Sequence, residues 1–302
     1  MQGAAAGGPG APAATTIGGR RFAWGARTYL VAVLNATPDS FSGDGVLDAT
    51  LAAERAERLV GAGADLVDIG AESTRPGAPA VDAYEEWRRL GPVLRTVRSR
   101  IDVPISVDTS KAEVARRAAD AGADALNDVR GLLGDPELAP LLASAGLPAI
   151  LMHNQRHHAR SGDPVADARA GLEQSLRVAR EAGIDEELLL LDPGFGFGWE
   201  PPENLELLVR LGELRALGRP LLIGTSRKST IGLVLDEPSP GRRLWGTAAT
   251  VALAVASGAD LVRVHDVEEM ALVARVADAV VRGWPAGDPA PLHPLGVGPP
   301  AG

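Results

Sequence analysis

Eight short apolar runs, separated by segments with a helical pattern, constrain the fold of this chain most strongly. The runs are rich in β-branched residues or leucine and predict buried strands, whereas segments such as "AERAERLVGAG" repeat apolar residues every three to four positions. Strands that alternate with helices indicate a parallel sheet. Eight such units predict an α/β fold, a single-domain (β/α)8 TIM barrel, with a doubly wound open sheet as the alternative. The predicted strands lie in "YLVAVLN", "DLVDIG", "PISVDTS", "DALNDV", "PAILMHN", "LLLLDPG", "PLLIGTS" and "DLVRVHD".

An internal repeat favours the barrel. The stretches "AGADLVDIG", "AGADALNDV" and "SGADLVRVH" each place Gly-Ala-Asp between a predicted helix and a predicted strand. Three positions after that aspartate comes a polar residue, Asp68, Asn127 or Arg263, where a barrel interior usually holds valine or isoleucine. The segments after the strands are long and rich in Gly, Pro, Ser and Thr. We therefore expect a ligand site at the carboxyl ends of the strands.

Composition and net charge limit the classes of function that this chain can have. The formal charge of -9 and the pI near 5.1 argue against a nucleic-acid or anionic-membrane surface, because both need an extended positive field. No apolar run is long enough to span a bilayer and the first residues lack a signal-peptide pattern, so we expect a cytoplasmic protein. The chain has no cysteine, which leaves oxygen and imidazole as ligands for a metal.

Both ends of the chain are rich in Ala, Gly and Pro and bury too little apolar surface to offset the entropy of ordering. No comparable linker interrupts the interior. We expect flexible tails at residues 1–16 and 285–302 and one barrel domain at residues 17–284.

Polar residues at the ends of the first and last predicted strands suit a phosphate-like ligand. Arg263 and His265 lie two apart on a strand, so their side chains leave the same face, and such a cation pair binds phosphate oxygens well. A salt-bridged arginine beside a hydrogen-bonded histidine is the alternative. Asn35 ends the first strand and offers one oxygen ligand, which suits Mg²⁺ together with phosphate oxygens and water.

Three more polar residues end strands in the middle of the chain. Asp108, Asn127 and Asp192 offer carboxylate and amide groups that can read the edge of a polar heterocycle. For Asp108 the alternative is a helix cap, because "DTSKAEV" also has the pattern of a helix start.

Two loops carry further cations. Arg227 and Lys228 in "GTSRKS", and Arg75 in "ESTRPG", indicate either an anion clamp or an ordinary solvated loop.

Two other stretches resemble known motifs but do not match them. "GFGFGW" lacks the third glycine of a dinucleotide fingerprint. "HNQRHH" has Asn154 where a zinc protease needs glutamate, so we interpret it as a histidine-rich loop.

Nine motifs resemble, in order, the signatures of bacterial dihydropteroate synthases. They are "LNATPDSFSGDG", "DIGAESTRPGA", "VDTSK", "LNDVRG", "LMHNQ", "LLLDPGFGFG", "IGTSRKSTIG", "RRLWGTAAT" and "RVHDV", and the resemblance covers residues 17–284. It implies a (β/α)8 barrel transferase that joins hydroxymethyl-dihydropterin pyrophosphate to para-aminobenzoate in folate biosynthesis and releases pyrophosphate. It also implies Mg²⁺, a homodimer and membership of the family that sulfonamides target.

The resemblance further implies roles for single residues, all of them toward small-molecule substrates. The catalytic set is Asp39, Arg75, Lys228, Arg263 and His265. The residues expected to bind the pterin are Asp108, Asn127, Asp192 and Lys228. Those expected to bind pyrophosphate are Asn35, Arg263 and His265, and Asn35 is also expected to contact the metal. The aminobenzoate pocket comprises Thr74, Arg75, Pro76, Gly196, Phe197 and Ser229.

Two alternatives to a synthase remain open. A pterin-binding methyltransferase on a related barrel would dock a corrinoid protein and would not need the "STRPG" and "SRKS" motifs. A non-catalytic paralogue would keep the fold without turnover.

Overall fold

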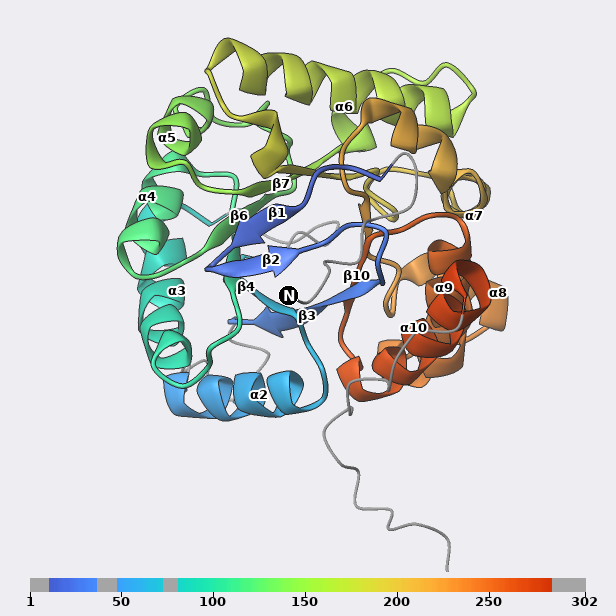
Figure 1. Ribbon diagram of the computed structural model, residues 1–302, viewed down its shortest axis with the longest axis horizontal. Coiled ribbons are helices and arrows are strands. Elements are labelled where there is room, and N and C mark those ends of the chain that lie inside the picture. The colour runs from blue at the N-terminus through green and yellow to red at the C-terminus, as the bar shows by residue number, and fades with distance from the viewer. Residues whose placement is uncertain (1–10, 37–47, 73–80, 284–302) are drawn as a thin grey trace, which may run out of the picture.

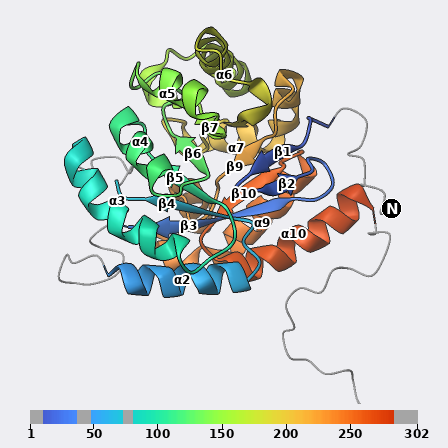
Figure 2. The same ribbon diagram turned by 60° about the vertical axis from the view of Figure 1, so that its left-hand side comes forward.

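The computed structural model describes residues 11–36, 48–72 and 81–283. Its central sheet is parallel, with the strand order β8-β7-β6-β5-β4-β3-β10-β9, and a bridge between Leu191 and Leu221 joins the two end strands. Helices surround this ring of strands (Figure 1), and the turned view in Figure 2 shows the same arrangement. The ring confirms the predicted (β/α)8 barrel and excludes the open doubly wound sheet.

Every run predicted as a strand contains one. The barrel strands are β3 (Tyr29–Asn35), β4 (Leu66–Gly70), β5 (Ile105–Asp108), β6 (Ala125–Asp128), β7 (Ala149–Met152), β8 (Leu189–Asp192), β9 (Leu222–Ile223) and β10 (Leu261–Val264). The helices are α2 (Ala49–Gly61), α3 (Ala83–Arg98), α4 (Ala112–Asp120), α5 (Leu138–Ala145), α6 (Pro164–Glu181), α7 (Pro201–Val209), α8 (Ser229–Leu235), α9 (Leu244–Ala256) and α10 (Val267–Arg282), with short 3-10 turns η1 (Gln155–His157), η2 (Glu186–Leu188), η3 (Leu211–Leu217) and η4 (Pro240–Arg242). Within the described ranges, no helix combines the length and the apolar character needed to cross a bilayer.

A hairpin of two short strands, β1 (Thr15–Ile17) and β2 (Arg20–Phe22), lies across one end of the barrel (Figure 1). Its Ile17 and Phe22 pack with Trp24 and Tyr29 against the apolar side chains that fill this end of the barrel. The Trp24 ring lies 5.5 Å from the centres of both the Phe22 and Tyr29 rings. The hairpin therefore closes the end of the barrel where the strands begin.

The hairpin changes the predicted amino-terminal boundary. Thr15 and Thr16 were expected in a flexible tail, but both belong to β1. Thr15 is buried; its Oγ1 donates to the carbonyl oxygen of Glu187 and accepts from Nε1 of Trp24. The expectations for residues 1–10 and 285–302 lie outside the described residues.

The Gly-Ala-Asp repeat forms the same clamp three times at this end of the barrel. In each copy the aspartate accepts a backbone N–H from the start of the neighbouring strand and pairs with an arginine. Because a strand start buried without a partner for its N–H would be costly, each aspartate fixes the position of its neighbour. The triplets are Asp65 with Leu30 N and Arg27, Asp124 with Ile105 N and Arg98, and Asp260 with Leu221 N and Arg215.

Candidate active site

The three polar residues of the repeat meet inside the barrel at one carboxylate. Asp68 is fully buried, and its Oδ2 accepts from Nε of Arg263 at 2.7 Å and from Nδ2 of Asn127 at 2.9 Å. Its Oδ1 accepts from Oγ of Ser106 at 2.7 Å. Asp68 thus holds the guanidinium of β10 and the amide of β6 in fixed orientations. The predicted site set omits Asp68, although its place in the repeat was a signal for it.

Asp108 belongs to the same network. The second guanidinium arm of Arg263 lies 3.3 Å from Oδ2 of Asp108, so one cation faces two carboxylates. Burial, and then the charge of Asp68, raise the pKa of Asp108, while Arg263 acts against them. The helix-cap alternative is wrong, because the N-cap of α4 is Lys111. Asp108 is only partly buried, which leaves this part of the barrel mouth able to accept hydrogen bonds from an N–H-rich ligand.

Asp192 and Lys228 lie beside this network, since the charges of both Arg263 and Asp108 act on Lys228. Asp192 ends β8 and accepts the backbone N–H of Gly194 at 2.7 Å. Burial raises its pKa, and the charge of Lys228 opposes that shift. Burial lowers the pKa of Lys228 to about 8. Its ammonium donates to the carbonyl oxygen of Phe195 and lies 4.7 Å from the centre of the Phe197 ring.

The glycines after β8 allow close backbone contacts. Gly196 has φ +83°, and a Cβ there would lie 2.8 Å from Cδ of Lys228. Gly194 has φ +75°, and a Cβ there would lie 1.9 Å from the carbonyl oxygen of His153. Both positions therefore require glycine. The loop brings Phe197 against Lys228, whose neighbour Ser229 starts α8 and is exposed.

His265 follows β10 beside Arg263. Its backbone N–H and its Nδ1 both lie within hydrogen-bond distance of Oγ of Ser226, at 3.2 and 3.0 Å. Burial, and then the charges of Arg263 and Arg227, lower the pKa of His265 to about 3. At this pKa His265 is neutral at pH 7 in the free protein, so Arg263 alone of the two carries a positive charge there, and their assignment to a phosphate-like ligand stays a prediction. Sequence alone does not show the burial that removes this charge.

Comparison with known proteins decides the family. Residues 31–265 match the family model of pterin-binding enzymes. A dihydropteroate synthase of Synechocystis is 45% identical over 278 residues, which cover 90% of this chain and 96% of that protein. This chain belongs to the dihydropteroate synthase family.

Solved structures of this synthase family share the fold. The Clostridium difficile synthase, determined in the presence of pteroic acid, is 44% identical with a TM-score of 0.83, covering 86% of this chain and 99% of that one. The Xanthomonas albilineans synthase with 4-aminobenzoic acid is 40% identical with a TM-score of 0.85, covering 91% of this chain and 100% of that one. These relatives are named as synthases, which favours the synthase over the methyltransferase alternative.

Asn35 was predicted to contact a metal, and it belongs to the described residues. It ends β3 next to Gly70 of β4, and its side chain makes no hydrogen bond to any residue that the structure describes. The same residues contain no group of three His, Asp or Glu side chains that would hold a metal alone. One free amide oxygen fits Mg²⁺, which often takes its other ligands from substrate phosphates and water.

Four predicted synthase residues, Asp39, Thr74, Arg75 and Pro76, lie outside the described residues. The histidine-rich loop after β7 is described in part. Nε2 of the buried His153 lies 2.7 Å from Oε1 of Gln155, and its ring is tilted by 47° against that of Trp199 with the ring centres 5.6 Å apart, in agreement with a structural role.

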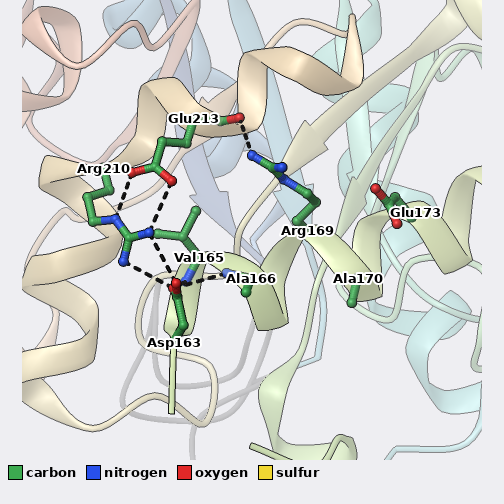
Figure 3. Close-up of a pocket in the computed structure, with 8 residues that line it drawn as sticks. All are labelled: Asp163, Val165, Ala166, Arg169, Ala170, Glu173, Arg210 and Glu213. Atoms are coloured by element: carbon green, nitrogen blue, oxygen red, sulfur yellow. Dashed lines mark hydrogen bonds and ion pairs between the residues drawn. The ribbon is translucent and has the colours of Figure 1, made fainter. Parts of the chain in front are cut away.

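A hollow on the outer surface does not belong to the synthase site. It has a volume of about 240 Å³ between α6 and the turn η3, and none of the predicted site residues lines it. Figure 3 shows Arg210 between Asp163 and Glu213 at its edge, where these groups form ion pairs. We interpret these contacts as a clamp that joins α6 to the helices after β8.

Proposed function

We infer that this chain catalyses the condensation of hydroxymethyl-dihydropterin pyrophosphate with para-aminobenzoate, giving dihydropteroate and pyrophosphate. The observation that carries this inference is the asymmetry of the barrel mouth. Buried carboxylates and an amide gather beside Lys228, and Arg263 connects this polar region to His265. One region suits the N–H-rich edge of a pterin, and the other suits a departing phosphate group.

We propose that Asp108, Asn127, Asp192 and Lys228 bind the pterin. A carboxylate that accepts two N–H bonds from a guanidine-like ring fragment gives strong planar recognition. Lys228 lies between Asp192 and the aromatic wall, so it can donate to a ring nitrogen or a carbonyl of the substrate. Asp68 orients Asn127 and Arg263 and acts as a positioning residue.

The remaining residues of this proposal promote the departure of pyrophosphate. Electron donation from the dihydropterin ring stabilises positive charge at the exocyclic methylene, so pyrophosphate leaves before the amine attacks. Arg263 supplies fixed positive charge toward the leaving group, and Ser226 at Nδ1 of His265 leaves Nε2 to face a phosphate oxygen. Asn35 would hold Mg²⁺, which neutralises pyrophosphate charge when bound. No protein nucleophile is needed.

The aminobenzoate site of the proposal combines Gly196, Phe197 and Ser229 with Thr74, Arg75 and Pro76. Phe197 provides the apolar wall beside Lys228, and Ser229 at the start of α8 provides a hydroxyl. Asp39 and Arg75 complete the catalytic set carried over from the family resemblance. Exclusion of water from the mouth would protect the cationic pterin from hydrolysis.

A homodimer is the assembly that we propose. Apart from Leu51 and Tyr84, the exposed large apolar side chains of the described residues lie on four consecutive helices, α7 to α10. Apolar side chains concentrated on one region typically mark a protein interface. They are Leu205, Val209, Leu233, Val234, Leu235, Trp245, Leu253, Leu272, Val276, Val280 and Val281. The cytoplasmic location stays a prediction.

Binding of the pterin substrate tests the assignment of the pocket. We expect calorimetry to show binding of hydroxymethyl-dihydropterin pyrophosphate to the full chain, and Asp108→Asn to weaken it by roughly tenfold or more, because the amide offers one acceptor oxygen in place of a carboxyl group. Glu173→Gln, an exposed acid on α6, is the matched control and should leave the affinity unchanged. Equal affinity in the Asp108 variant and the control would contradict the pterin assignment.

A further inference from the structure

A cavity of about 320 Å³ lies beside His265, and neither Asp68 nor Asp108 lines it. Arg55 and Arg58 of α2 line it, together with Arg227 after β9 and the start of α10. The helices α2 and α10 lie next to each other at the outside of the barrel in both Figure 1 and Figure 2. Because His265 lines this cavity and also belongs to the proposed pyrophosphate site, the two spaces adjoin.

The positive charges around this cavity are unequally compensated. Arg227 makes a two-point ion pair with Asp266, whose Oδ2 lies 2.9 Å from Nε. Arg55 is half-buried and makes no hydrogen bond or ion pair to any residue that the structure describes. Burial, and then the charges of Arg227 and Arg58, lower the pKa of Arg55, while the charge of Asp266, which is already paired with Arg227, opposes that shift. Among the described residues, no carboxylate contacts this half-buried guanidinium directly to offset its desolvation.

An anion with several oxygens has the chemistry to pair with Arg55. A guanidinium binds phosphate oxygens through two parallel N–H bonds, and a cavity of this volume is large enough for a small ligand. The wall is not uniformly basic, since three acids also line it: Asp266, which pairs with Arg227, and Glu268 and Glu269 in the first turn of α10. These carboxylates weaken the attraction for an anion, which suits a site that a product occupies briefly and leaves.

We propose that this cavity is an outer anion subsite, in which Arg55 takes up pyrophosphate as it moves away from Arg263 and His265. The proposal rests on the synthase function inferred above. Arg55 would then be a product-binding residue for the leaving group, separate from the residues that bind the pterin.

Calorimetric titration with pyrophosphate at constant ionic strength and fixed Mg²⁺ tests the subsite without requiring turnover. Arg55→Gln should weaken pyrophosphate binding by roughly tenfold, because one charged contact is lost. Glu268→Gln should strengthen binding by roughly twofold, because it removes a negative charge from the wall. Arg177→Gln makes the same charge change as Arg55→Gln at an exposed site on α6 and should match the wild type.

Opposite effects of the Arg55 and Glu268 variants, with no effect of the Arg177 variant, are the result that the proposal predicts. Wild-type affinity in the Arg55 variant would overturn it, as would equal weakening by the Arg177 variant, which would indicate only an overall charge effect. Turnover with wild-type pyrophosphate affinity in the Arg55 variant would reject the subsite and leave the synthase function intact. The predicted shifts without any turnover would support an anion site and reject the synthase function.

Discussion

Nε of Arg263 lies 2.7 Å from Oδ2 of Asp68 inside the barrel, although the two residues are 195 positions apart in the chain. This contact joins the first and last copies of the Gly-Ala-Asp repeat. It fixes the guanidinium that we assign to the leaving group against an acid that is itself fully buried. The substrate pocket therefore depends on a residue that we do not expect to touch the pterin.

Asp68→Asn tests this positioning role, since it keeps the size of the side chain and removes its charge. We expect stability to fall by roughly 3–5 kcal/mol, because the substitution breaks a buried charge network. We also expect kcat to fall more than the apparent affinity for para-aminobenzoate changes, because Arg263 loses its orientation. Denaturant unfolding and steady-state kinetics measure the two effects, and a stable variant with wild-type kcat would contradict the role.

Trp24→Ala tests the hairpin that closes the barrel. Removal of this buried ring should destabilise the protein by about 3–5 kcal/mol in chemical denaturation, because it leaves a cavity among packed side chains. Tyr84→Ala removes an aromatic ring that is 74% exposed, and its effect should stay within about 0.5 kcal/mol. If the loss of stability in the Trp24 variant were as small as that expected for the Tyr84 variant, the hairpin would add little to stability.

The charge of His265 gives a pH-dependent prediction. Its pKa of about 3 in the folded protein lies below the value of about 6.5 for an unperturbed histidine. The unfolded chain therefore binds the proton more tightly, and this residue lowers stability as pH falls from about 6.5 toward 3. The imidazole resonances of His265 should not titrate between pH 7 and 5 in the free protein. A midpoint near 6.5 would contradict the buried, neutral state.

Lys228 should set the alkaline limb of the pH profile. Its pKa of about 8 means that the ammonium loses its proton just above neutral pH. We expect kcat/KM for the pterin substrate to fall as pH rises through about 8, since this parameter reports ionisations of the free enzyme. Lys228→Arg should move this limb to higher pH, because a guanidinium keeps its charge. An unshifted limb in that variant would assign the ionisation to another group.

The apolar surface on α7 to α10 predicts the oligomeric state. Light scattering after size exclusion should give twice the chain mass of 31.2 kDa for the wild type. Val280→Glu places a charge at a position that is 79% exposed and should shift the protein toward the monomer. A wild-type monomer at micromolar concentration would reject the homodimer.

The sequence predicted the barrel because its strands and helices alternate with strong periodicity and because the Gly-Ala-Asp turns repeat. It did not predict β1 and β2, since three-residue strands in a segment rich in small residues carry no periodic signal. Their stability comes from contacts between Ile17, Phe22, Trp24 and the barrel interior, which only the folded chain brings together.

Prediction of the site was limited in the same way. The polar strand ends were recognised from the sequence, and Asp108, Asn127 and Arg263 do share one network. The central place of Asp68 and the neutral state of His265 depend on burial and on neighbours from distant strands. Neither property follows from the residue type or its spacing.

Release of pyrophosphate from hydroxymethyl-dihydropterin pyrophosphate, measured in the presence of Mg²⁺ with and without para-aminobenzoate, tests the central claim most directly. Mass detection of dihydropteroate in the same reaction identifies the product. We predict pyrophosphate release that depends on the amine and matches dihydropteroate formation in amount. Folded protein that binds the pterin substrate but gives no dihydropteroate would contradict the account and favour a non-catalytic paralogue.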